Sequence, residues 1–238
     1  MASPSDLSLP HVWRVTDLAV EEAVLPSGHA PLDAVLPGGG WPVGSLVELL
    51  QERPEAHAWQ LLLPALSALA REKPGPLVLV GAPFPPFVPA LAAQGLAADR
   101  LLWIRAEPPQ ARLWSAEQSL RCAEVMAVLA WLPQVRVAEL RRLHLAARQH
   151  RKLLFAFRPL GCRREASPSP LRLLLTGMDQ MQVEVLKRKG PPLESTLQLP
   201  AQSARMRALL ASRRRSLPLP VSTEERRSHV LDRLVTEP

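Results

Sequence analysis

The sequence has few of the residues that mark a secreted, metal-binding or membrane protein. Of its 238 residues only two are cysteines, Cys122 and Cys162, and they form neither a Cys-x-x-Cys motif nor a His/Cys cluster. A disulfide framework and a zinc site are therefore not expected. No apolar run reaches ~18 residues, and residues 1–10 lack the basic start and apolar centre of a signal peptide. We therefore expect a cytoplasmic protein without membrane contact.

Charged residues are distributed unevenly along the chain. Residues 1–135 carry 8 Lys/Arg and 13 Asp/Glu, whereas residues 136–238 carry 21 Lys/Arg and 9 Asp/Glu. The formal net charge of +7 therefore combines an acidic first part with a strongly basic second part. A polyanion or an acidic protein surface is the natural partner of such a basic segment, and a solvated tail that serves solubility is the alternative.

Apolar segments of strand length alternate with segments of helix length between residues 45 and 157. The expected strands are 47–50, 77–80, 100–105, 125–130 and 152–157, and the expected helices are 59–70, 87–95, 110–122 and 137–150. Strands that are apolar on both faces and alternate with helices are typical of a parallel α/β sheet. Two further strands, 172–175 and 182–189, are expected to end this sheet.

The composition changes near Gly190, where proline, serine and arginine become frequent and strand signals stop. We therefore divide the chain into an N-terminal arm (residues 1–24), an α/β core (residues 25–190) and a basic, Pro/Arg-rich tail (residues 191–238). The tail is expected to be mobile unless a partner orders it.

A phosphate-binding loop is expected after the first strand, but its motif is missing there. A phosphate-binding loop would continue with a glycine-rich turn ending in Gly-Lys-Ser/Thr, because its backbone N–H groups surround the phosphates and the lysine reaches their outer oxygens. Here the strand is followed by Gln51-Glu-Arg-Pro-Glu-Ala-His-Ala58, which has neither glycine nor lysine and carries two glutamates. The sequence therefore predicts a nucleotide-binding scaffold with a degenerate phosphate loop.

Several short motifs carry a resemblance to a known family. The approach to the missing loop, with Ser27-Gly28, Leu32-Asp33, Gly39-Gly40, Pro42, Gly44 and Glu48, is similar to that of RecA-type recombinases. Six further segments are similar to the ImuA family, the RecA-like accessory proteins of bacterial mutagenic lesion bypass: Leu36–Pro42, Leu61–Leu66, Pro89–Gly95, Leu101–Ile104, Leu113–Arg121 and Leu129–Leu132. The resemblance covers about residues 9–190 and implies a RecA-like, mostly parallel sheet flanked by helices.

The resemblance also implies what the degenerate loop has lost. Laid against the motif Gly-x-x-x-x-Gly-Lys-Thr of RecA-type ATPases, Gln51 falls on the first glycine, Ala56 on the second, His57 on the lysine and Ala58 on the magnesium-binding threonine. The strand 125–130 ends without the metal-orienting aspartate, and Gly81-Ala-Pro83 stands where a general-base glutamate is carried. Phosphoryl transfer needs positioned phosphates, a metal and an activated water. The expected protein is therefore not an enzyme and has no cofactor, metal or small-molecule substrate.

By this resemblance the chain is expected to be a non-catalytic adaptor in SOS-induced, error-prone translesion DNA synthesis and damage-induced mutagenesis. Its partners would be an ImuB-type protein, which is an inactive relative of Y-family polymerases, together with an error-prone DnaE-type polymerase and RecA. It would be nucleoid-associated when DNA is damaged. The alternative is a cell division inhibitor of the SulA type, a nucleotide-free RecA-like fold that sequesters the tubulin-like division protein. The length of the chain and its arginine-rich tail favour the adaptor.

Basic side chains are the candidate contacts with these partners or with DNA. They are Lys187, Arg188 and Lys189 at the end of a strand, and Arg205, Arg207, Arg213, Arg214 and Arg215 in the tail; a further group, Arg141, Arg142, Arg148, Arg151 and Lys152, surrounds the helix 137–150. Phosphate contacts by such residues would be sequence-independent and salt-sensitive. Few aromatic residues lie among them for base stacking. Whether DNA is contacted directly stays open at this point.

Tryptophans and isolated acids are expected to have structural roles. Trp103 and Trp131 lie within apolar strands and are predicted to be in the core. For Trp41 and Trp59, which flank the degenerate loop, packing is favoured over the anchoring of a partner. Helix capping or ion pairing is expected for Asp33, Glu48 and Glu117.

Overall fold

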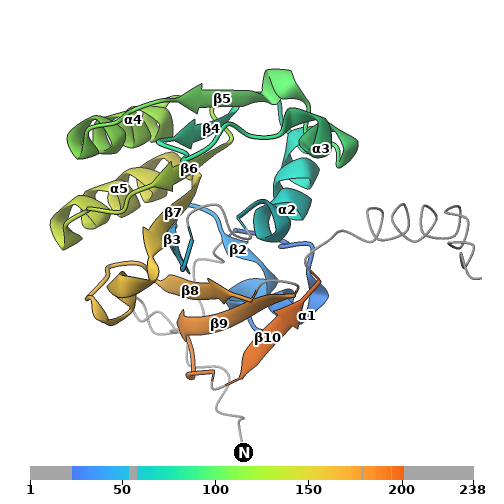
Figure 1. Cartoon of the computed structure of the whole chain (residues 1–238), viewed down its shortest axis with the longest axis vertical. Helices are drawn as coiled ribbons and strands as arrows, with labels where there is room; N and C mark the ends of the chain where they lie inside the picture. Colours follow the sequence, from blue (N-terminus) through green and yellow to red (C-terminus); the bar gives the residue numbers. More distant parts are fainter. Residues whose placement is uncertain (1–22, 54–57, 178–179, 194, 201–238) are drawn as a thin grey trace, which may run out of the picture. The chain divides into compact units, whose positions relative to one another are not determined.

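An eight-stranded sheet runs through the part of the chain that the computed structural model describes, which is residues 23–53, 58–177, 180–193 and 195–200 (Figure 1). The strand order is β10-β9-β8-β3-β7-β6-β4-β5. The six strands from β8 to β5 in this order are parallel, whereas β9 pairs antiparallel with β8 and β10 pairs antiparallel with β9. The fold is therefore α/β with a mostly parallel mixed sheet flanked by helices.

The elements of the sheet and its helices agree closely with the expected segments. The strands are β3 (Leu46–Gln51), β4 (Leu77–Val80), β5 (Leu101–Ile104), β6 (Ala127–Trp131), β7 (Leu153–Pro159), β8 (Leu171–Thr176), β9 (Met181–Lys187) and β10 (Thr196–Leu199). The helices are α1 (Ala30–Asp33), α2 (Ala58–Glu72), α3 (Val88–Ala93), α4 (Pro109–Arg121) and α5 (Val137–His150), with short 3₁₀ turns η1 (Pro37–Gly39), η2 (Ala98–Arg100) and η3 (Leu160–Arg164). A separate two-stranded sheet joins β1 (Val24–Leu25) to β2 (Trp41–Pro42).

The two faces of the sheet are covered by different helices. Alternate residues of β3 point to opposite faces, so Val47 and Leu49 pack with α2 in one hydrophobic core while Leu46 packs with α4 and α5 in another. Figure 1 shows α2 on one side of the sheet and α4 with α5 on the other. All six residues of β3 are buried because the strand lies between β7 and β8 and is covered on both faces.

The segment before β3 braces helix α2. Pro64 lies inside α2 and has no N–H, so the carbonyl of Gln60 loses its usual helical partner. The Nε2 atom of His29 lies 3.2 Å from the carbonyl oxygens of both Gln60 and Leu61 and donates to them. Gly28 has φ +80° and approaches Pro64 so closely that a Cβ atom would lie 2.4 Å from the proline Cβ. Gly28 of the Ser27-Gly28 motif is thus explained by its close packing against Pro64 of α2.

Two expectations from the sequence need correction. Beyond Gly190, where no strand was expected, β10 pairs with β9 over four residues. Its sequence Thr-Leu-Gln-Leu is short and only partly apolar, which is common at the edge of a sheet. Trp103 is half-buried and not in the core, since β5 is the other edge strand, and the Arg105 guanidinium lies 5.4 Å from its ring centroid. Trp131 is buried, as expected.

Candidate functional site

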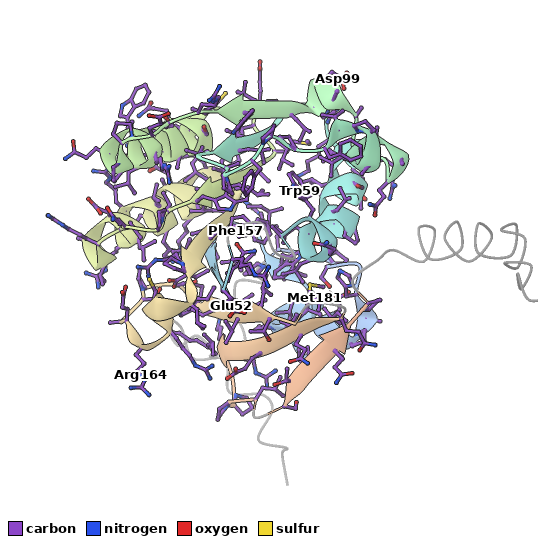
Figure 2. The ribbon with its side chains drawn as sticks, viewed as in Figure 1. Glu52, Trp59, Asp99, Phe157, Arg164 and Met181 are labelled. Carbon is purple, nitrogen blue, oxygen red and sulfur yellow. The ribbon has the colours of Figure 1, made fainter. Side chains whose placement is uncertain are left out.

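The carboxyl ends of β3, β4, β6 and β7 meet at one edge of the sheet. In open α/β sheets ligands bind outside this edge, where helices leave neighbouring strands toward opposite faces. Here α2 follows β3 on one face and α5 follows β6 on the other. A cavity of about 180 Å³ lies at this edge and is lined by Gln51, Glu52, Gly81, Pro83, Arg112, Trp131, Pro133, Phe157, Arg158 and Pro159. Glu52 and Phe157 are labelled there in Figure 2.

The degenerate loop begins at this cavity. Gln51 is the last residue of β3, where it pairs with Pro159 and Leu175 of the neighbouring strands, and it is buried. Ala58 is the first residue of α2 and is also buried. Ala56 and His57 lie outside the described residues. The two described positions of the loop thus carry a buried amide and a buried methyl group.

Two aromatic rings form one wall of the cavity. Trp131 and Phe157 occupy paired positions at the ends of β6 and β7, and their rings stack with centroids 4.3 Å apart and an interplanar angle of 17°. The wall is therefore apolar. Trp41 lies deeper, fully buried, with its ring edge-on to Phe155 at 5.3 Å. Trp59 is half-buried and packs against the same core. The packing role predicted for Trp41 and Trp59 is confirmed.

Both arginines that line the cavity are held by the protein itself. The Nε atom of Arg112 donates to the carbonyl of Ala106 at 2.7 Å, and its Nη1 donates to the carbonyl of Trp131 at 3.3 Å. Gly81 has φ +62°, and a Cβ atom there would lie 2.7 Å from Arg112 Nε, so the glycine leaves room for this guanidinium. Arg158 belongs to a buried ion-pair network. Two carboxylates balance the charge of Arg158, whereas Arg112 is held by two carbonyl oxygens.

The buried network is centred on Glu48, in the middle of β3. Its carboxylate accepts from Arg158 Nη1 at 2.8 Å and from Arg172 Nε at 2.9 Å, and its side chain is fully buried. Arg172 also donates to the carbonyls of Cys162, Arg163 and Glu165 around η3, and Arg158 donates to the Glu165 carboxylate at 2.7 Å. The ion-pair role predicted for Glu48 is confirmed. Glu117 pairs with Arg121 and Arg142, and Asp33 accepts from the Ser27 N–H.

The contacts and burial around this network shift the pKa values of Arg158, Glu165 and Cys162. Burial alone would lower the pKa of Arg158, but hydrogen bonds to Glu48 and Glu165 outweigh it and raise that pKa above its usual value. The hydrogen bond from Arg158 lowers the pKa of Glu165. Burial raises the pKa of the Cys162 thiol beneath η3, which makes a thiolate nucleophile less accessible there. Arg158 and Glu165 therefore stay ionised near neutral pH, and Cys162 stays a thiol.

Size and ligand chemistry argue against a nucleotide at this edge. Pockets that hold small ligands are typically about 300–1,000 Å³, larger than this cavity of about 180 Å³. Within the described residues no group of three or more His, Cys, Asp or Glu side chains could hold a metal ion.

The basic residues that were predicted to contact a partner or DNA do not lie together in one site. Lys187 ends β9 and donates to the carbonyl of Ser167 at 2.9 Å, while Arg188 donates to the carbonyls of Pro191 and Val35. Both line an open cavity of about 550 Å³ together with Arg163 and Arg164. Lys189 lines another cavity, at the opposite edge of the sheet. Arg205, Arg207, Arg213, Arg214 and Arg215 lie outside the described residues.

Some residues at the site were not found from the sequence. Arg112 and Arg158 were not singled out, because an arginine in a helix or at a strand end gives no sign of the carbonyl or carboxylate that it contacts. The pairing of Trp131 with Phe157 depends on the register of β6 against β7, which links positions far apart in the chain.

Fold and site together define an α/β protein with a mostly parallel eight-stranded sheet and a small cavity at the carboxyl edge of that sheet. A scan against protein-family models and a search of curated proteins found no match to this chain. Among the helices of the described part, none is long and apolar enough to cross a membrane.

Proposed function

We propose that this chain is a non-catalytic, RecA-like adaptor of the ImuA type, which acts in SOS-induced, error-prone translesion synthesis. It would work with an ImuB-type protein, an error-prone DnaE-type polymerase and RecA by bringing them together. The proposal rests on the side chains that line the carboxyl edge of the sheet. A scaffold of this class would bind its nucleotide there, whereas here Arg112, Arg158 and the stacked Trp131–Phe157 pair line a cavity of only about 180 Å³.

The mostly parallel sheet supports the RecA-like part of the proposal, and so does the role of the segment before β3. His29 and Gly28 are bound to helix α2 and serve its packing. The approach to a phosphate loop can therefore persist in a protein that has no use for the loop itself. Without a nucleotide at the carboxyl edge, the function of the protein would depend on surfaces of the core and on the basic residues beyond the core.

The partners can be tested by pull-down from DNA-damaged cells. The full chain is compared with a truncation after Pro200, which keeps β10 in the sheet and removes the basic residues 201–238. If the tail carries the contacts, the full chain retains the ImuB-type protein and RecA while the truncated chain does not. A circular dichroism melt controls for folding of the truncated core. Failure of the full chain to retain either partner would contradict the proposal.

Deletion and overexpression separate the adaptor from a division inhibitor. The adaptor predicts that deletion abolishes damage-induced mutagenesis and that overexpression without damage leaves cell length unchanged. Filamentation on overexpression, with mutagenesis intact after deletion, would favour the SulA-type alternative.

A further inference from the structure

The amino edge of the sheet carries a second cavity, opposite the carboxyl edge described above. Its volume is about 400 Å³, and it lies where Gly44 and Ser45 lead into β3. Arg148, Arg151 and Lys189 line it together with His144, and no carboxylate is among the described residues that do so. The fold thus joins two basic groups that are far apart in the sequence, one at the end of α5 and one after β9.

The two arginines are available for a ligand. Both are exposed, and within the described residues neither guanidinium makes an ion pair or a side-chain hydrogen bond. Their neighbour Lys152 differs, because its ammonium donates to the carbonyls of Ala123 and Val125. An adjoining cavity shares Arg151, and its lining includes Glu72 together with Lys73.

The backbone at Arg151 is a separate indication of function. Arg151 ends α5 in the left-handed conformation, with φ 50° and ψ 45°, and it is the one non-glycine residue with positive φ in the described ranges. Glycine is usual at this position of a helix end, since any Cβ atom is disfavoured there. A helix C-terminus attracts a cation, which accounts for Arg148 in the last turn. It does not account for a charged side chain kept in a conformation that favours glycine.

His144 adds an uncharged donor. Its Nδ1 atom accepts from the N–H of Leu46 at 3.1 Å, so the ring proton is on Nε2. Burial and the nearby Arg148 lower its pKa, which keeps the ring neutral near pH 7. The Ser45 hydroxyl lines the same cavity. Cationic forks and neutral donors together are the groups that commonly hold phosphate oxygens.

We propose that this cavity binds the phosphodiester backbone of a nucleic acid strand, with Arg148, Arg151 and Lys189 as phosphate contacts and His144 as a hydrogen-bond donor. Apolar but not aromatic residues also line the cavity, among them Val43, Leu171 and three prolines, and all of its charged side chains are cationic. A polymer of uniform negative charge matches these cations better than a protein surface does, because a protein surface presents charges of both signs. Without aromatic rings for stacking, binding is independent of base sequence. The inference does not rest on the adaptor function.

The test is fluorescence anisotropy of a labelled oligothymidine with the full-length protein. The variant R148Q/R151G removes two phosphate contacts and places glycine at the left-handed position, so it keeps its fold. Each lost contact lowers the salt-dependence slope by about 0.7, so we expect a decrease of about 1.4 and roughly tenfold weaker binding at 0.15 M salt. The matched control R53Q/R141Q removes two exposed arginines outside the cavity and should change affinity less than twofold, a loss smaller than about 0.4 kcal/mol.

A local measurement separates the cavity from the rest of the basic chain. Phenylglyoxal modifies free arginines, and oligothymidine should slow its reaction at Arg148 and Arg151 but not at Arg141, as read by mass spectrometry. Equal affinities of the two variants, or no protection of the two arginines, would overturn the proposal. Equal protection by polyglutamate would assign the cavity to an acidic protein, and equal protection by millimolar inorganic phosphate to a small anion. Partner pull-down by R148Q/R151G is expected to be intact, so failure here leaves the adaptor proposal standing.

Discussion

Replacing Glu48 by glutamine tests the buried network at the centre of the sheet. The change keeps the shape of the side chain but leaves two guanidinium groups without their shared carboxylate. The side chains of Glu48, Arg158 and Arg172 are 0%, 2% and 8% exposed, so solvent cannot replace the lost partner. Breaking a buried pair in this way costs about 3–5 kcal/mol. For a protein of this size that corresponds to a melting temperature lower by about 6–20 °C.

Replacing Arg158 and replacing Arg172 should lower the free energy of unfolding by different amounts. Arg158 keeps Glu165 as a second carboxylate, whereas Arg172 also satisfies three backbone carbonyls around η3. Replacing Arg172 by methionine leaves those carbonyls without their donor, so R172M should cost more than R158M. Replacing all three members by apolar residues, as in E48L/R158M/R172M, should recover stability relative to E48Q, because no uncompensated charge remains.

Urea unfolding followed by tryptophan fluorescence measures these differences. The control is E117Q, which disrupts a carboxylate whose partners Arg121 and Arg142 have side chains that are 56% exposed. Its expected cost is about 1 kcal/mol, below that of E48Q, because both partner arginines are open to solvent although the Glu117 side chain is only 11% exposed. If E48Q were no less stable than E117Q, the argument that Glu48 organises the sheet through its charge would be refuted.

Three further predictions concern a helix brace, pH and the nucleotide. H29A should lower the free energy of unfolding by about 0.5–1.5 kcal/mol, because the carbonyls of Gln60 and Leu61 lose the His29 donor at a partly exposed site. H29A/P64A should recover part of this loss, since an N–H returns to position 64, and urea unfolding measures both. Burial lowers the pKa of His29 and His144 from 6.5, so the unfolded chain takes up protons first as the pH falls. The free energy of unfolding should therefore decline as the pH is lowered from about 7.5 to 5.5, and less so in H29Q/H144Q; no decline would contradict the assignment of neutral rings. Millimolar ATP should leave the melting temperature unchanged, whereas a ligand at ~100 times its Kd would add about 2.7 kcal/mol.

Much of the fold could be predicted because the strands and helices have clear local signals. The helix 137–150 alternates apolar and basic residues at helical spacing, and the structure has α5 at Val137–His150. The strand 77–80 is four apolar residues after Pro-Gly-Pro, and β4 has the same bounds. β10 has no such signal, because its stability comes from pairing with β9 and only Leu199 is buried.

The site was harder to predict because it depends on register. The ionic role of Glu48 was expected, but its partners lie more than a hundred residues later, and they face it only because β3 pairs in register with β8 and lies beside β7. The basic groups at Arg148 and Lys189 were both noticed in the sequence. That they line one cavity follows from where α5 and β9 end in space, which no local pattern encodes.

The position of β3 between β7 and β8 also has a consequence for biosynthesis. This strand is made early, yet both of its partners are translated only after residue 152. At about 5–20 residues per second, roughly 6–25 s pass between the synthesis of Gln51 and that of Thr176. Throughout that interval both edges of β3 lack their partner strands, and its four apolar residues would form an aggregation-prone stretch without Glu48 among them. The carboxylate that later organises the finished sheet thus acts first as a gatekeeper, which keeps the unpaired strand in solution until its arginines emerge.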